Sequence, residues 1–202
     1  MKKINKIVIG TNNEGKFEEM CQLLPSDLEK ISLSDHKTQS PAEIGTSFCE
    51  NSVIKARHFS RLFKLPCLSD DSGLEVDILN NQPGIFSSRW AGEKKNFAVA
   101  IDKVLNEMEK KDKNWKTNNK AKFVCSLTLY WPDDKFVSSN GIINGKIVDQ
   151  KRGDNGFGYD PIFVPDGFKQ TFGEMKLEKK MKIDHRSKAF KLLNIIYFNQ
   201  FY

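Results

Sequence analysis

Two adjacent carboxylates, Asp70 and Asp71, directly follow the short apolar run 65–68 and are themselves followed by Ser72 and Gly73. The apolar run indicates a buried strand, and the glycine would let the chain turn sharply, so the pattern predicts a strand that ends at the aspartates. Neighbouring side chains of an extended backbone point to opposite faces, so the two aspartates should have different partners. An Asx turn would use the same residues. Alternatively, one aspartate is held by local structure while the other faces a cleft, where it can ligate a hard cation or accept a proton from water.

The composition is that of a single globular domain over residues 1–202. Of these residues, 39% are hydrophobic and 29% are charged, which is enough for a sizeable core. The apolar runs are far shorter than a membrane span, and no apolar signal segment follows the basic start 1–3, so we expect a cytoplasmic protein. The four cysteines are scattered without a C-x-x-C pair and only three histidines occur, which argues against disulfides and a zinc site.

The net charge of +6 suits an anionic partner. Much of this charge lies in two lysine-rich runs, and we expect the first, 110–122, to be a solvated loop. One hypothesis is therefore a basic nucleic-acid-binding module without catalysis. It leaves Asp70 and Asp71 unexplained, because carboxylates repel phosphates unless a cation lies between them. A nucleotide-binding protein without catalysis is a third hypothesis.

Strand and helix patterns mix along the chain without strict alternation, which favours an α/β fold with a mixed sheet flanked by helices. Strands are expected at 6–9, near 31–33, before Asp70, at 74–79, at 123–131 and 135–143 as a hairpin, and at 161–164. Helices are expected around 17–24, over 47–63 and 97–108, and from about 187 toward the C-terminus. The helix over 47–63 begins with the capping-box pattern Ser47-x-x-Glu50 and has a stripe of residues suited to burial.

Residues 10–16 follow a strand, open a helix and match the phosphate-binding pattern G-x-x-x-x-G-K. The next residue is Phe17, where that loop needs a serine or threonine for magnesium, so the P-loop hypothesis fails at its metal position. The N–H groups at the helix start, the Thr11 hydroxyl, the Asn13 amide and the Lys16 ammonium can still hold phosphate oxygens. The structural alternative is a helix cap with a surface lysine.

Five blocks occur in order along nearly the whole chain: 11–16, 43–51 with Lys55 and Ala56, 69–74 with 83–89, 156–161, and 184–186. Together they make the sequence resemble the inosine triphosphate pyrophosphatase family, whose members hydrolyse non-standard purine nucleoside triphosphates. The resemblance implies an elongated central sheet and two lobes with a deep nucleotide-binding cleft between them. It also implies magnesium-dependent hydrolysis of ITP, dITP or XTP to the monophosphate and pyrophosphate, usually by a homodimer, without a nucleic-acid or membrane partner. Such hydrolysis prevents incorporation of these nucleotides into DNA and RNA.

The resemblance also implies roles for individual residues. It assigns the triphosphate to Thr11, Asn13, Lys16, Lys55 and Arg89. Asp71 is expected to be the general base and a magnesium ligand, with Glu43 as the second metal carboxylate and Ser72 in contact with the substrate. Glu50 is interpreted as structural, and Asp70 either braces the turn or supports the metal shell.

Recognition of the base is implied for two further segments: Phe157, Gly158, Tyr159 and Asp160, and the group Lys180, His185 and Arg186. Donors aimed at a 6-oxo oxygen would accept inosine and reject the 6-amino group of adenine. The structural alternative is a glycine-rich turn with Phe157 and Tyr159 in the core. Asp184 stands where the family usually has serine; both residues suit a helix cap, but a carboxylate touching the base would shift the preference among purines.

Overall fold

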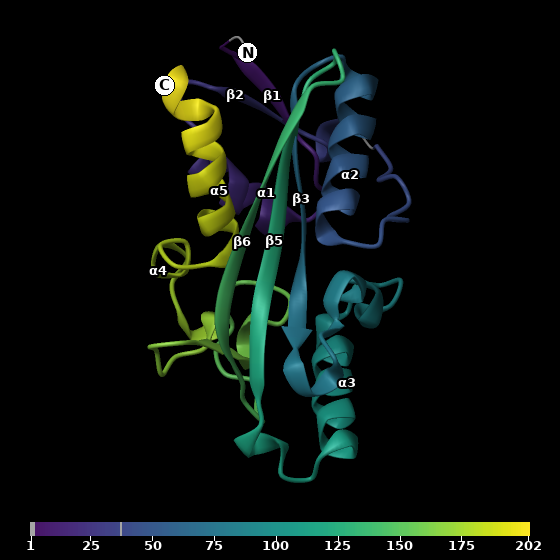
Figure 1. The fold of residues 1–202 in the computed structure, drawn as a ribbon, viewed down its shortest axis with the longest axis vertical. Helices are drawn as coiled ribbons and strands as arrows, with labels where there is room; N and C mark the ends of the chain where they lie inside the picture. Colours follow the sequence, from purple (N-terminus) through teal and green to yellow (C-terminus); the bar gives the residue numbers. More distant parts are fainter. Residues whose placement is uncertain (1–2, 37) are drawn as a thin grey trace. The chain divides into compact units, whose positions relative to one another are not determined.

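The structure, a computed structural model, describes residues 3–36 and 38–202 and is an α/β fold, as predicted (Figure 1). Its strands are β1 (Lys6–Ile9), β2 (Glu29–Ser32), β3 (Cys67–Val76), β4 (Gln82–Pro83), β5 (Lys120–Tyr130), β6 (Phe136–Ile147) and β7 (Phe163–Pro165). Its α-helices are α1 (Glu14–Leu23), α2 (Phe48–Phe63), α3 (Phe97–Lys111), α4 (Leu177–Lys180) and α5 (His185–Ile196). No helix within the described ranges combines the length and the apolar character needed to cross a membrane.

The strands form one mixed sheet in the order β2-β1-β3-β5-β6-β7, with β4 paired to β3. Strand β1 is parallel to β2 and β3, whereas β4 runs antiparallel to β3 and β7 antiparallel to β6. This confirms the predicted mixed sheet. The described residues group into two compact units, the first from residues up to 71 with 125–141 and 186–202, the second from 72–124 and 142–185. The single domain over 1–202 stays a prediction.

The first unit packs helices on both faces of its strands. Ile7 and Ile9 of β1 lie in a buried cluster with Met20 of α1 and residues of α5, whereas Val8 between them lies in another cluster with Phe59 of α2. This is the alternation expected of an extended chain with both faces covered. Figure 1 shows α5 and α2 on opposite sides of the strands.

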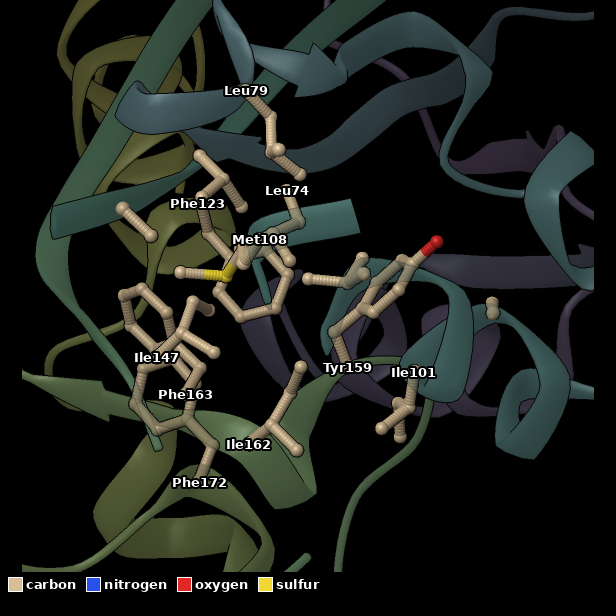
Figure 2. Packing of buried hydrophobic residues seen from close by; sticks show 14 of the residues in the cluster. Leu74, Leu79, Ile101, Met108, Phe123, Ile147, Tyr159, Ile162, Phe163 and Phe172 are labelled. Atoms are coloured by element: carbon tan, nitrogen blue, oxygen red, sulfur yellow. The ribbon is translucent and has the colours of Figure 1, made fainter. Parts of the chain in front are cut away.

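The second unit has its own hydrophobic core, shown in Figure 2. Phe123 of β5 lies against Phe163 of β7, with ring centroids 4.6 Å apart, and Phe172 packs beside both. Helix α3 contributes Ile101 and Met108 to the same cluster. Buried aromatic side chains that pack in this way contribute strongly to the stability of a core.

The prediction that a strand ends at the aspartates is wrong. Strand β3 continues through Asp70 and Asp71 to Val76, and 77–79 form a 3₁₀ turn instead of continuing as a strand. Gly73 therefore lies inside the strand. The strand can continue because cations neutralise both carboxylates, as described below, so their burial does not force the chain out to solvent.

The start of α2 follows the sequence pattern only in part. The Ser47 hydroxyl caps the helix by accepting from the Glu50 N–H at 3.2 Å, as predicted. The Glu50 carboxylate, however, accepts from the N–H and hydroxyl of Thr46 instead of the N–H of Ser47. Glu50 therefore supports the loop before α2, which carries Glu43.

Candidate active site

Lys16 is fixed by the start of α1 and reaches a buried carboxylate. Asn13 caps the helix, because its side-chain oxygen accepts from the Lys16 N–H at 2.9 Å, and the Asn13 N–H donates to the Thr11 hydroxyl at 3.2 Å. The cap alternative is thus correct for Asn13. Lys16 is not a plain surface lysine, since its Nζ lies 2.9 Å from Asp70 Oδ2 and its side chain is only 17% exposed.

Asp70 lies in a buried network of charges on one face of β3. Its Oδ2 accepts from Lys16 Nζ and from Arg186 Nη2, the latter at 3.0 Å, and Arg186 also pairs with Glu19 of α1. Burial alone would raise the pKa of Asp70, but the charges of Lys16, Arg186 and Lys55 hold it below the usual range. A lowered pKa favours the ionised form of Asp70, and its ion pairs with Lys16 and Arg186 join β3 to α1 and α5.

Asp71 has a separate set of partners, which confirms that the two neighbouring aspartates are used differently. Lys55 Nζ of α2 lies 2.8 Å from Asp71 Oδ1 and 2.7 Å from Glu43 Oε1. Asn51, one helical turn before Lys55, donates from Nδ2 to Asp71 Oδ2 at 3.3 Å. Asp71 is thus flanked by a cation, an amide and a second carboxylate.

The electrostatics of this group suit a base. Burial raises the pKa of Asp71 and Glu43 adds to the rise, while Lys55 and Lys16 oppose it. Burial alone would lower the pKa of Lys55, but Asp71, Asp70 and Glu43 raise it, so Lys55 stays charged. A carboxylate with a raised pKa accepts a proton more readily than an ordinary aspartate, and the fixed ammonium beside it can neutralise an anion.

In the second unit, a buried ion pair organises the glycine-rich segment. Lys180 Nζ lies 2.6 Å from Asp160 Oδ2, and the Phe157 N–H donates to the same oxygen at 2.9 Å. Gly156 has φ of +73°, and a Cβ there would collide with Asp160. Lys180 also lies over the Phe157 ring, 4.6 Å from its centroid. The buried Asp160 carboxylate therefore stabilises the turn that precedes it, through its contacts with Lys180 and the Phe157 N–H. Gly158, in the same turn, is half-buried.

Tyr159 and His185 are both buried in the second unit. The Tyr159 hydroxyl donates to the Ser87 carbonyl at 2.9 Å, and its ring packs in the core shown in Figure 2. His185, the first residue of α5, stacks on Phe123 with ring centroids 4.9 Å apart. The core alternative thus describes Tyr159, and contact of either residue with a substrate stays a prediction.

The two remaining predicted residues lie nearer the surface. Ser72 is half-buried on β3, and Arg89 is exposed, with its guanidinium 4.9 Å from the centroid of the Phe86 ring. Contact of either residue with the substrate stays a prediction.

Within the first unit, the structure brings together Lys16, Lys55, Glu43, Asp71 and Arg186, and within the second, Phe157, Asp160 and Lys180. Sequence reasoning missed Asn51 and Glu19. A signal for both was present, because each lies three or four residues from a predicted lysine on the same helix. The pairs are Asn51 with Lys55 and Glu19 with Lys16.

The lysine-rich run 110–122 is not wholly a loop, because α3 extends to Lys111 and β5 begins at Lys120. Several of its lysines are paired with carboxylates. These pairs are Lys110 with Glu107, Lys116 with Asp149, and Lys122 with Glu75. A basic surface that carries its own acidic partners attracts phosphates less strongly, which weakens the nucleic-acid hypothesis.

Comparison with known proteins places the chain in a family. The sequence model of the Ham1 family matches residues 7–195. A protein of Zymomonas mobilis named dITP/XTP pyrophosphatase is 43% identical over 93% of this chain and 90% of its own length. A protein of the same name from Caulobacter vibrioides is 41% identical over 96% of this chain and 98% of its own.

Solved structures agree with the sequence comparison. A HAM1 protein from Coxiella burnetii superposes with a TM-score of 0.85 at 36% identity, covering 97% of this chain and all (100%) of its own. The Ham1 protein of Staphylococcus aureus has a TM-score of 0.83 at 35% identity, covering 96% and 99%. The predicted resemblance is thereby confirmed, and this chain belongs to the Ham1 family.

Proposed function

We propose that this chain is a nucleoside triphosphate pyrophosphatase that hydrolyses non-standard purine nucleotides such as ITP, dITP and XTP to the monophosphate and pyrophosphate. One structural observation carries the proposal. The buried Asp71 carboxylate contacts Lys55 and Asn51, and Glu43 forms an ion pair with the same nitrogen of Lys55. That arrangement supplies a base, a cation and a pair of metal-ligating carboxylates. The names of the relatives from Zymomonas and Caulobacter support the same reaction class.

Magnesium is the metal that this donor set fits. Asp71 and Glu43 each use one oxygen to contact Lys55 Nζ, at 2.8 and 2.7 Å, so the two carboxylates lie close enough together for both to ligate one ion beside the lysine. Magnesium takes one or two protein carboxylates and completes its octahedral shell with water and substrate phosphates. The described residues contain no group of three or more His, Cys, Asp or Glu side chains placed to hold a metal ion. When bound, the ion would neutralise phosphate oxygens of the substrate.

The residues of the first unit account for the chemical step. A water molecule attacks the α-phosphorus, and Asp71 accepts the proton that this water loses. The new oxygen–phosphorus bond forms as the bond from the α-phosphorus to the bridging oxygen breaks, and pyrophosphate leaves with that electron pair. The ammonium groups of Lys16 and Lys55 stabilise the negative charge of the phosphate chain.

Base selection is proposed for the second unit. Lys180 and His185 can offer donors to a 6-oxo purine, and the half-buried Phe157 ring offers a stacking surface. The homodimer, the cytoplasmic location and a cleft that binds the nucleotide are further parts of the proposal, implied by the resemblance described above.

The products from ITP test the reaction class. Purified protein with magnesium should release IMP and pyrophosphate, and no orthophosphate, in the first turnover. ATP should be hydrolysed much more slowly, by up to roughly 10⁴-fold in kcat/KM, because its 6-amino group lacks the acceptor that the proposed donors need. Chromatography of the nucleotide and a pyrophosphate assay without added phosphatase give the answer. Orthophosphate as the first product would reject the proposal in favour of a γ-phosphate hydrolase.

Removal of the metal tests the proposed dependence of the reaction on magnesium. Dialysis against EDTA should abolish hydrolysis of ITP, and added magnesium should restore it, because Asp71 and Glu43 supply only part of the metal shell. Calcium offers a control: it binds oxygen ligands but prefers a larger and less regular shell, so it should restore less activity. Full activity in EDTA would contradict the metal-dependent mechanism.

A further inference from the structure

Asn51 links two parts of the first unit that carry the proposed catalytic carboxylates. Its side chain is completely buried (0% exposed) on the inner face of α2. Its Nδ2 donates to Asp71 Oδ2 at 3.3 Å, and its Oδ1 accepts from the Gly45 N–H at 2.8 Å. Gly45 lies two residues after Glu43. One amide thus touches the β3 carboxylate and the loop that carries the second carboxylate.

The two oxygens of Asp71 are held by donors from the same helix. Lys55 donates to Oδ1 at 2.8 Å and Asn51 to Oδ2 at 3.3 Å. Residues four apart lie on the same side of a helix, so the two donors form a rigid pair. Two donors at the two oxygens fix the plane of the carboxylate, whereas the lysine alone would leave it free to rotate about the Cβ–Cγ bond.

The other end of the Asn51 amide requires the close approach of a glycine. A Cβ on Gly45 would lie 2.7 Å from Asn51 Oδ1 and 2.7 Å from Glu50 Cβ. Any other residue at position 45 would therefore push the loop away from α2. The approach of Gly45 brings the loop close enough for Glu43 to reach Lys55.

We propose that Asn51 is a positioning residue for the reaction: it sets the orientation of the Asp71 carboxylate and the place of Glu43 in one step. The inference rests on the proposed function, because it assigns to Asn51 a part in the hydrolysis that Asp71 performs. A buried amide of this kind could also serve stability alone, since burying polar groups without partners is costly. The two roles predict different results.

Two substitutions separate the two hydrogen bonds. Asn51→Asp keeps the shape and the acceptor for the Gly45 N–H but removes the donor to Asp71. Asn51→Ala removes both bonds. Ser60→Ala is the matched control, because Ser60 is equally buried on α2 and its hydroxyl donates to the Leu65 carbonyl, at the far end of the helix.

We expect both Asn51 variants to lose about 10- to 100-fold in kcat for ITP, the size of effect that a misplaced catalytic group produces. KM should change less than about threefold, because the cap residues of α1 and Lys16 are untouched. Ser60→Ala should lower the melting temperature and leave kcat per folded molecule unchanged.

Hydrogen exchange provides a readout that does not depend on activity. The Gly45 amide should exchange faster in Asn51→Ala than in the unchanged protein, because its acceptor is gone, and should stay protected in Asn51→Asp. If kcat of both variants stays within twofold of the unchanged protein, or falls only in proportion to the folded fraction, the inference is wrong. The unchanged protein is the reference in each assay, so its failure to hydrolyse ITP would reject the proposed function, not the role of Asn51.

Discussion

Replacing Asp71 with asparagine should lower kcat for ITP by a factor on the order of 10²–10⁴, the usual contribution of a general base. The asparagine keeps the size of the side chain but cannot accept the proton that the attacking water loses. Burial and the nearby Glu43 raise the pKa of Asp71 while Lys55 and Lys16 oppose the rise, and a raised pKa suits the role of proton acceptor proposed for this carboxylate. Steady-state kinetics with ITP and magnesium measure the effect.

The loss in this variant should be one of chemistry and not of folding. Lys55 keeps its ion pair with Glu43 at 2.7 Å, so the helix and the loop stay joined, and the melting temperature should change little. Asp133→Asn provides a matched control, because Asp133 is exposed and pairs with Lys135 on the surface. If Asp71→Asn retained near-normal activity, Asp71 would have no place in the mechanism.

The sequence correctly predicted that Asp70 and Asp71 have different partners, but not their local structure. Aspartate and glycine are depleted in strands, so Asp70-Asp71-Ser72-Gly73 indicated a strand end and a turn. Their partners come from distant parts of the chain: Lys16 from α1 and Arg186 from α5 on one side. Strand propensity cannot include such neutralisation, because it depends only on residues that are near in sequence. The alternation of side chains along an extended backbone, by contrast, correctly predicted that the two aspartates have different partners.

A residue that positions other side chains, as proposed for Asn51, carries a weak signal in the sequence. Lys55 was predicted through the family resemblance, as a residue that binds the triphosphate, and the structure buries it to 6% exposure. Asn51 lies four residues before Lys55. The capping pattern Ser47-x-x-Glu50 predicts a role for Glu50 but none for Asn51. An asparagine inside a helix is neutral or slightly unfavourable by propensity, so its presence on a buried face is itself a sign of a specific partner.

Arg186 shows where a family resemblance and the structure emphasise different roles. The resemblance implied contact with the base. The structure places its guanidinium, 1% exposed, between the carboxylates of Glu19 and Asp70 in the first unit. His185, its neighbour in sequence, belongs to the second unit. The base-binding role stays a prediction, while the ion pairs already require a positive charge at this position.

A second large effect is therefore expected from Arg186→Met. The substitution keeps an unbranched apolar stem but removes the guanidinium from between two buried carboxylates, Glu19 and Asp70, which are 2% and 1% exposed. Removing one partner of a buried ion pair typically costs about 3–5 kcal/mol, because the remaining charge loses its compensation without regaining water. We expect a decrease of that size in the free energy of unfolding, measured by urea denaturation without nucleotide.

Arg61→Met is the matched control for this experiment. Arg61 also forms a bidentate pair with a carboxylate, that of Asp134, but on the surface, where solvent screens the charges. The surface variant should therefore unfold almost like the unchanged protein, whereas Arg186→Met should unfold at a clearly lower urea concentration. Equal stability of the two variants would show that Glu19 and Asp70 do not depend on Arg186. Its burial would then have to be explained by a role in binding, which the kinetics of the same variant with ITP and ATP would reveal as a change in the preference between the two bases.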